Sequence, residues 1–378
     1  MKLKCIRCQS VDRIITMNGL SYCRSCIAFK RVLVGEKFIA QAYSNLNDKA
    51  TYHLDYTLSF EQKEISKRIV NNYINQKNTV VQAVCGSGKT ELVYDCICYA
   101  LSKKEHVCFA LPRRELAIEI YERLNNQFSN TKIALVHGGK TSELEGDIVI
   151  CTTHQLYRYY QSFDLLIIDE IDAFPFYLND VLKEIAYQSV KGKMIFLSAT
   201  LEKSDIDIIA DFIVLNRRYH NYDLPVPKIK VYPFLIALIA GYRKIKAYKK
   251  ENKLVLIFVP TIARTKVIKK YLSYLGLKTK LIHSKTKDKA SVLELFKAQE
   301  IDALITTTLL ERGITFSNVQ VLVYDSEHQV FNHSTLIQIA GRVGRKPDYP
   351  SGDVIFYTSS KSQAMIKCIQ KIKEMNTV

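Results

Sequence analysis

A short glycine-rich run holds the residue types that bind the phosphates of a nucleotide. Residues 83–90 read Ala-Val-Cys-Gly-Ser-Gly-Lys-Thr, between a strand-like apolar segment and a helix-like one. Glycines let backbone N–H groups curl around phosphate oxygens, and the start of a helix adds positive potential. Lys89 would reach the β- and γ-phosphates, and the Thr90 hydroxyl would bind Mg²⁺. The residues predicted to hold ATP and Mg²⁺ are Gly86, Ser87, Gly88, Lys89 and Thr90.

Two acidic residues follow a second apolar run. Residues 165–172 read Leu-Leu-Ile-Ile-Asp-Glu-Ile-Asp. This order places Asp169 to hold the metal ion and Glu170 to orient or deprotonate an attacking water. Phosphoryl transfer depends chiefly on positioning and on neutralising charge, so the acids and the glycine-rich loop together predict ATP hydrolysis. Without that loop, acids after a strand would more simply be a solvated strand end.

A pair of arginines lies far along the chain. Residues 338–345 read Gln-Ile-Ala-Gly-Arg-Val-Gly-Arg, on an expected helix where Arg342 and Arg345 would share a face. An arginine supplied from a second domain stabilises transition-state charge only when the domains close, which couples hydrolysis to movement. A basic surface helix is the alternative interpretation.

Four cysteines near the N-terminus have the spacing of metal ligands. Two residues separate the members of each pair, and fourteen residues separate the pairs. Four thiolates bind one tetrahedral Zn²⁺, and a segment this poor in core residues would depend on the metal to fold. Basic and aromatic residues around the cysteines could contact DNA, solubilise the module or dock a protein. The predicted zinc ligands are Cys5, Cys8, Cys23 and Cys26.

These residues need rigid elements to position them. Apolar β-branched runs alternate with amphipathic helical stretches from Ser59 onward, which indicates parallel sheets covered by helices on both faces. The expected strands are 79–85, 106–111, 132–136, 147–152, 163–169 and 193–198, then 254–259, 278–282, 302–307, 319–324 and 353–357, followed by a basic helix over 361–375.

The strands fall into two groups, so we expect two tandem α/β domains behind a small zinc module. A segment with three prolines, 222–233, interrupts the alternation and is the expected hinge. The expected divisions are 1–35 for the zinc module, 36–58 for a linker to which no chemistry is assigned, 59–224 for the first α/β domain and 225–378 for the second.

Composition favours a polyanionic partner. The chain has 378 residues and a formal net charge of +17, which suits nucleic acid or an anionic membrane face. No apolar run is long enough to span a bilayer and no signal segment is apparent, so a cytoplasmic location is expected. Cysteines in that compartment stay reduced.

Taken together, the motifs resemble those of superfamily-2 helicases from Ser59 to Arg345. Further stretches agree with that family: Pro112–Leu116 with motif Ia, Ser198–Thr200 with motif III, and Thr306–Gly313 with motif V. The resemblance implies two RecA-like domains. It also implies that Gln62 reads the adenine edge, that Phe60 stacks nearby and that Gly313 belongs to the nucleotide site.

Within that superfamily, the four-cysteine module and the run 169–175 are similar to the ComFA family of competence ATPases. Ile171 in place of the third acid of the DEAD pattern weakens an assignment as a DEAD-box RNA helicase. Resemblance to ComFA implies a motor that pulls single-stranded DNA through the membrane uptake channel with a ComFC-like partner. It also implies a position at the inner face of the cell membrane.

Hydroxyl groups, arginines and helix N-termini at the ends of β-strands would bind the phosphates of a DNA strand without reading its sequence. We therefore expect an ATP-dependent single-stranded DNA translocase, which could act as a monomer or as an oligomer. The alternatives are a replication-restart or RNA helicase, and a non-motor zinc-finger adaptor. The candidate DNA contacts are Arg113, Arg114, Thr152, Thr153, Thr261, Thr307 and Thr308.

Overall fold

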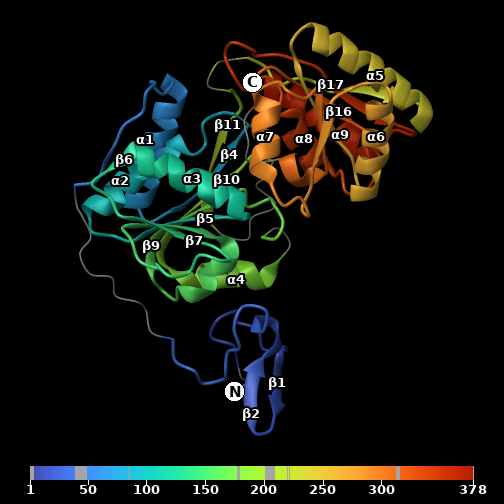
Figure 1. Cartoon of the computed structure of the whole chain (residues 1–378). Coiled ribbons are helices and arrows are strands. Elements are labelled where there is room, and N and C mark those ends of the chain that lie inside the picture. Colours follow the sequence, from blue (N-terminus) through green and yellow to red (C-terminus); the bar gives the residue numbers. More distant parts are fainter. Residues whose placement is uncertain are drawn as a thin grey trace. The chain divides into compact units, whose positions relative to one another are not determined.

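A computed structural model describes residues 4–38, 49–84, 86–176, 179–200, 209–218, 220, 222–311 and 316–377 (Figure 1). The chain divides into two compact units. Unit 1 comprises Met1–Ala83 and Gly88–Leu215, and unit 2 comprises Val84–Ser87 and Asn216–Val378. Each unit contains one parallel sheet. The predicted fold class, two tandem α/β domains, is therefore confirmed.

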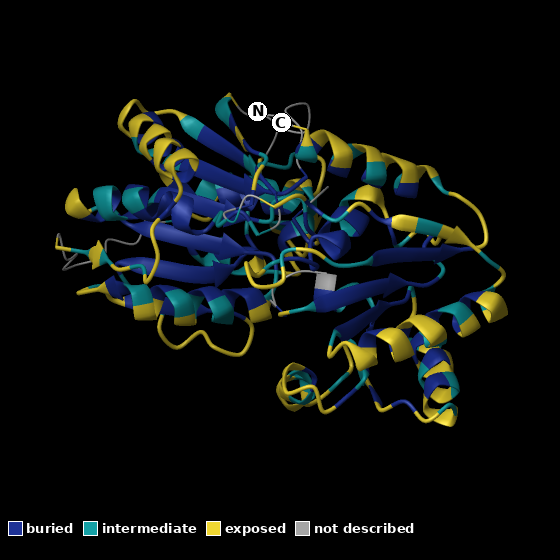
Figure 2. Ribbon diagram, turned by 90° about the horizontal axis from the view of Figure 1, so that it is seen from above, coloured by how far each residue is buried: buried dark blue, intermediate teal, exposed yellow. Residues whose placement is uncertain are grey.

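Unit 1 is built on a seven-stranded parallel sheet in the order β11-β4-β10-β9-β5-β8-β7. Its central strands are buried on both faces, as their continuous apolar sequences predict (Figure 2). The strands are β4 (Asn78–Ala83), β5 (Val107–Leu111), β7 (Ile133–Val136), β8 (Ile148–Thr152), β9 (Phe163–Asp169), β10 (Val190–Ser198) and β11 (Ala210–Leu215).

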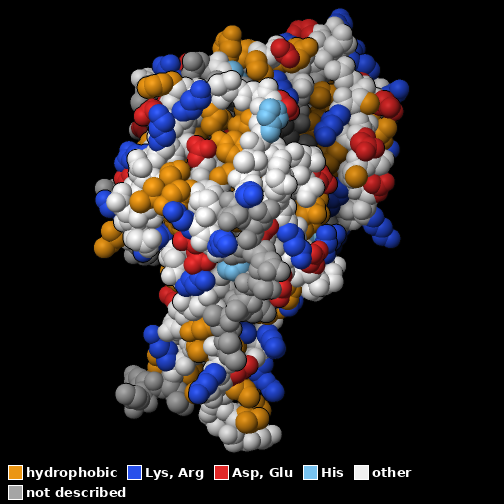
Figure 3. All heavy atoms as spheres, turned by 90° about the vertical axis from the view of Figure 1, so that its left-hand side faces the viewer, with side chains coloured by type: hydrophobic (Ala, Val, Ile, Leu, Met, Phe, Trp, Pro, Cys, Tyr) orange, Lys and Arg blue, Asp and Glu red, His pale blue; other side chains and the backbone are white. Residues whose placement is uncertain are grey.

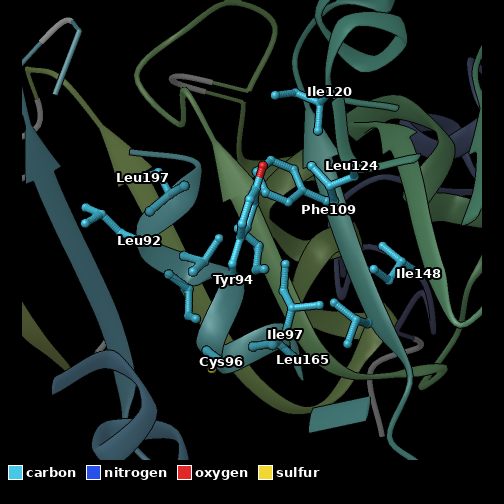
Figure 4. Packing of buried hydrophobic residues seen from close by; sticks show 14 of the residues in the cluster. Leu92, Tyr94, Cys96, Ile97, Phe109, Ile120, Leu124, Ile148, Leu165 and Leu197 are labelled. Carbon is cyan, nitrogen blue, oxygen red and sulfur yellow. The ribbon is translucent and has the colours of Figure 1, made fainter. Parts of the chain in front are cut away.

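Helices cover this sheet, and their apolar faces pack on it. Tyr94, Ile97, Phe109 and Leu165 interdigitate in one such cluster (Figure 4). The helices of unit 1 are α1 (Phe60–Ile74), α2 (Tyr94–Ser102), α3 (Arg114–Gln127) and α4 (Asp180–Ser189), with 3-10 turns η2 (Glu91–Val93) and η3 (Thr153–Arg158).

Unit 2 has a six-stranded parallel sheet in the order β12-β17-β16-β13-β15-β14. Its strands are β12 (Lys228–Val231), β13 (Leu254–Phe258), β14 (Thr279–Ile282), β15 (Ala303–Thr306), β16 (Val319–Val323) and β17 (Val354–Thr358). Its helices are α5 (Phe234–Lys250), α6 (Ile262–Tyr274), α7 (Lys289–Lys297), α8 (His333–Ala340) and α9 (Gln363–Asn376), with a 3-10 turn η5 (Thr308–Glu311).

Two strands of the parallel sheets were not expected from the sequence. β11 joins the edge of the first sheet beside β4, and β12 lies inside the proline-bearing segment expected as a hinge. Prolines 225, 227 and 233 flank β12 without entering it, and β12 is an edge strand, where proline is tolerated nearby. The expected linker also contains a two-residue strand, β3 (Thr51–Tyr52), which pairs with β6 (Phe128–Ser129) after α3.

The N-terminal module is a small hairpin of β1 (Ile14–Met17) and β2 (Leu20–Cys23), followed by the turn η1 (Arg24–Cys26). Its core consists of the four cysteines with Val32, which matches a domain that has few apolar residues of its own. Among the described residues, no helix is long and apolar enough to cross a membrane.

Candidate nucleotide and zinc sites

The predicted phosphate- and magnesium-binding residues lie where strands of unit 1 end. In the sheet, β10 separates β4 from β9, and all three strands are parallel. Their carboxyl ends therefore share one edge, where α/β proteins bind ligands. The glycine-rich loop follows β4, and Asp169 is the last residue of β9. The fold thus brings the loop's Lys89 and the acids to one edge of the sheet.

The glycine-rich loop has the backbone that phosphate binding requires. Gly86 and Gly88 have φ angles of +84° and +76°, which L-residues rarely adopt. Ser87 is buried, and Thr90 is 7% exposed. Cys85 lies outside the described residues. The φ angles explain why glycine occupies both positions.

Gln62 lies against this loop. A Cβ atom at Gly88 would be only 2.7 Å from Gln62 Nε2. The Gln62 Oε1 atom accepts a hydrogen bond from the Ser59 N–H at 2.8 Å, in a capping box that starts α1. This bond fixes the amide with its Nε2 toward the loop. The predicted contact of Gln62 with adenine stays a prediction, but its position beside the loop suits that role.

Tyr56 is a candidate that sequence reasoning missed. Its hydroxyl donates a 2.9 Å hydrogen bond to Glu91 Oε1, and Glu91 directly follows Thr90 of the loop. Tyr56 is 52% exposed, and Phe60, at the start of α1, is 81% exposed. An aromatic residue shortly before Gln62 was the available sequence clue.

Asp169 is buried, and its environment suits a metal ligand. Burial raises the pKa of Asp169 to about 6, while the nearby Lys89 ammonium opposes that rise. Its Oδ1 atom accepts a hydrogen bond from the Glu170 N–H at 2.8 Å. Glu170 has a φ angle of +55°. A buried carboxylate and the Thr90 hydroxyl are oxygen donors of the kind that Mg²⁺ prefers, so the residues fit this ion.

Motif III is hydrogen-bonded to the acidic segment after β9. The Thr200 hydroxyl donates a 2.6 Å hydrogen bond to Asp172 Oδ2, and the Thr200 N–H donates to Ser198 Oγ at 3.1 Å. Asp172 lies just past β9, and Ser198 ends β10. The bond therefore joins the ends of two neighbouring strands.

The predicted helix carrying both arginines was wrong. α8 ends at Ala340, and residues 341–344 form turns. Gly341 caps the helix, and Gly344 has a φ angle of +72°, which favours glycine and stops helix continuation. Arg342 is 1% exposed, while Arg345 is partly buried and donates through Nε to Gly341 O at 2.9 Å. The arginines thus lie in a tight turn rather than on one helical face.

The candidate DNA contacts of unit 1 lie at strand ends, as expected. Arg113 occupies the N-cap position of α3, and Arg114 is the exposed first residue of the helix. Thr152 ends β8, and Thr153 begins η3. The Thr153 hydroxyl is buried and has no hydrogen-bond partner among the described residues.

The candidate contacts of unit 2 also follow strands. Thr261 follows β13, and its side chain accepts a hydrogen bond from the Arg264 N–H, so it caps α6. Thr307 and Thr308 follow β15 and are partly buried. Gly313 of motif V lies outside the described residues. Contact of any of these residues with DNA stays a prediction.

The four N-terminal cysteines form a compact buried cluster. Their Sγ atoms all lie within 4.8 Å of one another, with 3.8 Å between Cys5 and Cys26 and 3.5 Å between Cys8 and Cys23. A tetrahedral zinc ion with Zn–S bonds of about 2.3 Å separates its sulfurs by about 3.8 Å. The cluster therefore fits Zn²⁺.

The module packs against η3 of unit 1. The Phe29 ring lies 5.9 Å from His154 and 6.1 Å from Tyr157, measured between ring centroids. The Arg7 guanidinium lies over the rings of Phe38 and Tyr157, at 5.1 and 5.4 Å. η3 begins at Thr153, so the module contacts the segment that carries a candidate DNA contact. Lys and Arg side chains line the module's sides in Figure 3.

Known proteins are similar to this chain over nearly its whole length. Residues 63–209 match the DEAD/DEAH box helicase family, and residues 234–347 match the helicase conserved C-terminal domain. The chain is 34% identical to competence protein ComFA of Streptococcus pneumoniae, over 99% of this chain and 90% of that protein. It is 31% identical to competence protein ComFA of Bacillus subtilis, over 99% of this chain and 86% of that protein.

Solved structures share the fold. Dbp5 of S. cerevisiae, bound to RNA and ADP BeF3, has a TM-score of 0.56 at 16% identity, covering 84% of this chain and 92% of that one. RecG bound to a three-way DNA junction has a TM-score of 0.59 at 20% identity, covering 85% of this chain and 45% of that one. At such identities the likeness concerns the fold alone, two RecA-like domains. The helicase domains and the nearly full-length similarity together establish that this chain belongs to the ComFA family of superfamily-2, ATP-hydrolysing helicase-type enzymes.

Proposed function

We propose that this chain is an ATP-driven motor that moves along single-stranded DNA and drives DNA uptake in natural transformation. One observation carries the proposal: similarity to ComFA extends over 99% of the chain, so it includes the zinc module as well as both helicase domains. The net charge of +17 supports a polyanionic partner. The inherited role includes a ComFC-like partner and a place beside the uptake channel at the inner membrane face.

The nucleotide site supports hydrolysis through positioning and charge. Lys89 neutralises the β- and γ-phosphates, and Thr90 and Asp169 are the residues that hold Mg²⁺, which supplies charge neutralisation when bound. Glu170 orients the attacking water. Tyr56 stacks on adenine beside Gln62, since its hydroxyl is held by Glu91 and its ring is half exposed.

The second unit contributes the arginines that make hydrolysis depend on domain closure. Arg345 meets the γ-phosphate as the transition state forms, and the buried Arg342 supports the turn that carries it. Closing on ATP and opening after hydrolysis would move the strand, which Arg113 and the strand-end threonines hold by its phosphates. Phosphate contacts of this kind do not read sequence.

On this proposal, the zinc module holds a structural zinc ion through Cys5, Cys8, Cys23 and Cys26. The four buried sulfurs, at separations that suit one tetrahedral ion, support this assignment. Its fold would depend on the metal because its core contains little else. The module's contact with η3 gives a route by which a DNA strand or a ComFC-like protein bound to it would influence the motor.

Steady-state ATP hydrolysis with different polymers tests the proposal. Zinc-loaded protein is measured alone and with single-stranded DNA, duplex DNA or RNA, and Lys89→Ala and Glu170→Gln are the controls. We expect stimulation by single-stranded DNA, lost in both variants. Stimulation by RNA alone would support an RNA helicase instead. Absence of turnover with every polymer would support a non-motor zinc-finger adaptor.

A further inference from the structure

We propose that Arg218 is a positioning residue that holds the arginine-bearing turn of unit 2 and ties it to the segment joining the two units. This inference rests on the role proposed above for Arg345. Arg218 is 2% exposed, among the largest buried side chains of the described chain, although it lies in irregular backbone just after β11. A buried guanidinium is costly unless hydrogen bonds satisfy it, so its surroundings indicate what it does.

The guanidinium of Arg218 spans the turn after α8. Its Nη1 atom donates a 2.6 Å hydrogen bond to Gly344 O, and its Nη2 atom reaches Gly341 O at 3.4 Å. Gly341 O also accepts the 2.9 Å bond from Arg345 Nε. The same carbonyl therefore serves both arginines, and movement of Arg218 would alter the support of the Arg345 side chain.

The backbone of the turn after α8 suits these two hydrogen bonds from Arg218. Gly341 caps the C-terminus of α8, where the carbonyls carry partial negative charge and favour a cation. Gly344 has a φ angle of +72°, and a Cβ atom there would lie 2.8 Å from Arg218 Nη1 and 2.3 Å from Pro350 O. His220 Nε2 lies 3.0 Å from the same Gly344 oxygen. The segment around Arg218 is thus fastened to the turn at both of its glycines.

The other end of this segment is fixed in unit 1. β11 ends at Leu215, which pairs with Ala83, the last residue of β4 before the phosphate loop. Only Asn216 and Arg217 separate Leu215 from Arg218. Three extended residues span at most about 10 Å. A shift of the strand beside the phosphate loop would therefore pull directly on the residue that supports the arginine turn.

The chemistry specifies arginine at this position. A planar guanidinium presents donors in a fixed fork that can reach two carbonyls at once, whereas a lysine ammonium offers one point charge. Arg218 would thus keep the turn in the shape that presents Arg345. Its loss should lower the rate of hydrolysis more than the affinity for ATP.

The test compares Arg218→Lys with Arg217→Lys, a neighbouring arginine that is exposed on the same segment. For each variant, kcat and KM for ATP are measured at saturating single-stranded DNA, together with melting temperature and binding of a fluorescent ATP analogue. We expect Arg218→Lys to lower kcat about tenfold to a hundredfold. We expect its KM and analogue affinity to stay within about threefold of wild type, with Arg217→Lys unchanged. If Arg218→Lys does not fold, Arg218→Gln takes its place.

A double variant separates positioning from mere stability. Because both arginines act through one turn, adding Arg218→Lys to Arg345→Lys should lower kcat by less than about threefold further. Normal kcat in Arg218→Lys, a rise in KM alone or fully additive losses would each overturn the inference while leaving the proposed role of Arg345 intact. Normal kcat in Arg345→Lys would overturn that role, and the inference with it.

Discussion

Asp172 and Thr200 form a bond that connects the hydrolytic acids to the end of β10. The 2.6 Å hydrogen bond joins the segment after β9 to motif III, and Ser198 accepts a second one from the Thr200 backbone. Asp172 lies three residues beyond Asp169, the residue expected to hold Mg²⁺. A change at the metal site would therefore reach motif III through one side-chain contact.

Thr200→Val should uncouple hydrolysis from movement. Valine has nearly the shape of threonine but cannot donate to Asp172, so the acids stay in place while the link to motif III is lost. We expect kcat for ATP to fall less than about tenfold, and translocation along single-stranded DNA to fall more steeply. The measurement is the number of nucleotides moved per ATP hydrolysed.

Thr200→Ser is the matched control, because it keeps the hydroxyl and should retain the wild-type ratio. Equal losses of hydrolysis and movement in Thr200→Val would contradict a coupling role for this bond.

At the residue scale, the candidates that the sequence offered are those that their neighbours along the chain identify. Asp169 and Glu170 follow an apolar strand, and Lys89 stands in a glycine-rich run. Tyr56 and Arg218 were not predicted, because their partners, Glu91 and the glycines after α8, lie far along the chain. Sequence periodicity carries no information about such contacts.

Among the elements, β11 deserves a direct test because it joins unit 1 to the segment that carries Arg218. Asp211 of β11 accepts two hydrogen bonds from Arg68 of α1, at 2.8 and 2.6 Å, and one from Asn72 at 2.9 Å. The Arg68 guanidinium, foremost among these groups, holds the pKa of Asp211 below its ordinary value. The pair is partly exposed, so water and salt screen it.

Asp211→Asn should lower the free energy of unfolding by about 1 kcal/mol at neutral pH. Because the folded-state pKa of Asp211 is depressed, its contribution is present above the ordinary aspartate pKa and is lost as pH falls through the folded-state value. The difference between wild type and variant should therefore shrink toward pH ~3. Urea unfolding at both pH values measures it. A difference that does not change with pH would contradict the ion-pair account.

The zinc module should lose both its metal and its fold when one ligand is removed. Cys23→Ser leaves three thiolates, too few for a structural tetrahedral site, so we expect zinc content to fall from about one ion per chain to near zero. The module should then become sensitive to protease, because its core is the cysteine cluster. Zinc analysis and limited proteolysis check both outcomes.

Cys98→Ser is the control, since Cys98 lies on α2 outside the cluster and should keep full zinc content. Retention of zinc by Cys23→Ser would contradict the four-cysteine assignment.

Elements were predicted well wherever their sequence pattern is continuous. β9 has the predicted limits, and most other expected strands agree within a few residues. β12 was missed because it is an exposed edge strand whose Lys-Ile-Lys-Val sequence lacks a continuous apolar run. β11 contains the apolar run Phe212–Leu215, so its sequence did offer the signal of a strand. The arginine helix was extended too far because two glycines, rather than a loss of apolar periodicity, end α8.

For the whole molecule, the charge of +17 predicts that binding to single strands weakens steeply with salt. Each phosphate contact contributes a slope of about −0.7 in a plot of log affinity against log salt concentration. Arg113→Ala should therefore make the slope shallower by about 0.7, the contribution of one phosphate contact. Titrations of labelled oligonucleotide at several salt concentrations measure it. Lys67→Ala, on the exposed side of α1, is the control and should leave the slope unchanged.

Movement along a single strand is the central claim, and displacement of streptavidin from biotinylated single-stranded DNA tests it most directly. We expect the protein to strip streptavidin from one end of the strand, dependent on ATP hydrolysis, with Lys89→Ala and Glu170→Gln inactive. Comparing strands biotinylated at the 5′ end with strands biotinylated at the 3′ end gives the direction of travel. Stimulated ATP hydrolysis without displacement from either end, or displacement that survives in Lys89→Ala, would contradict the account.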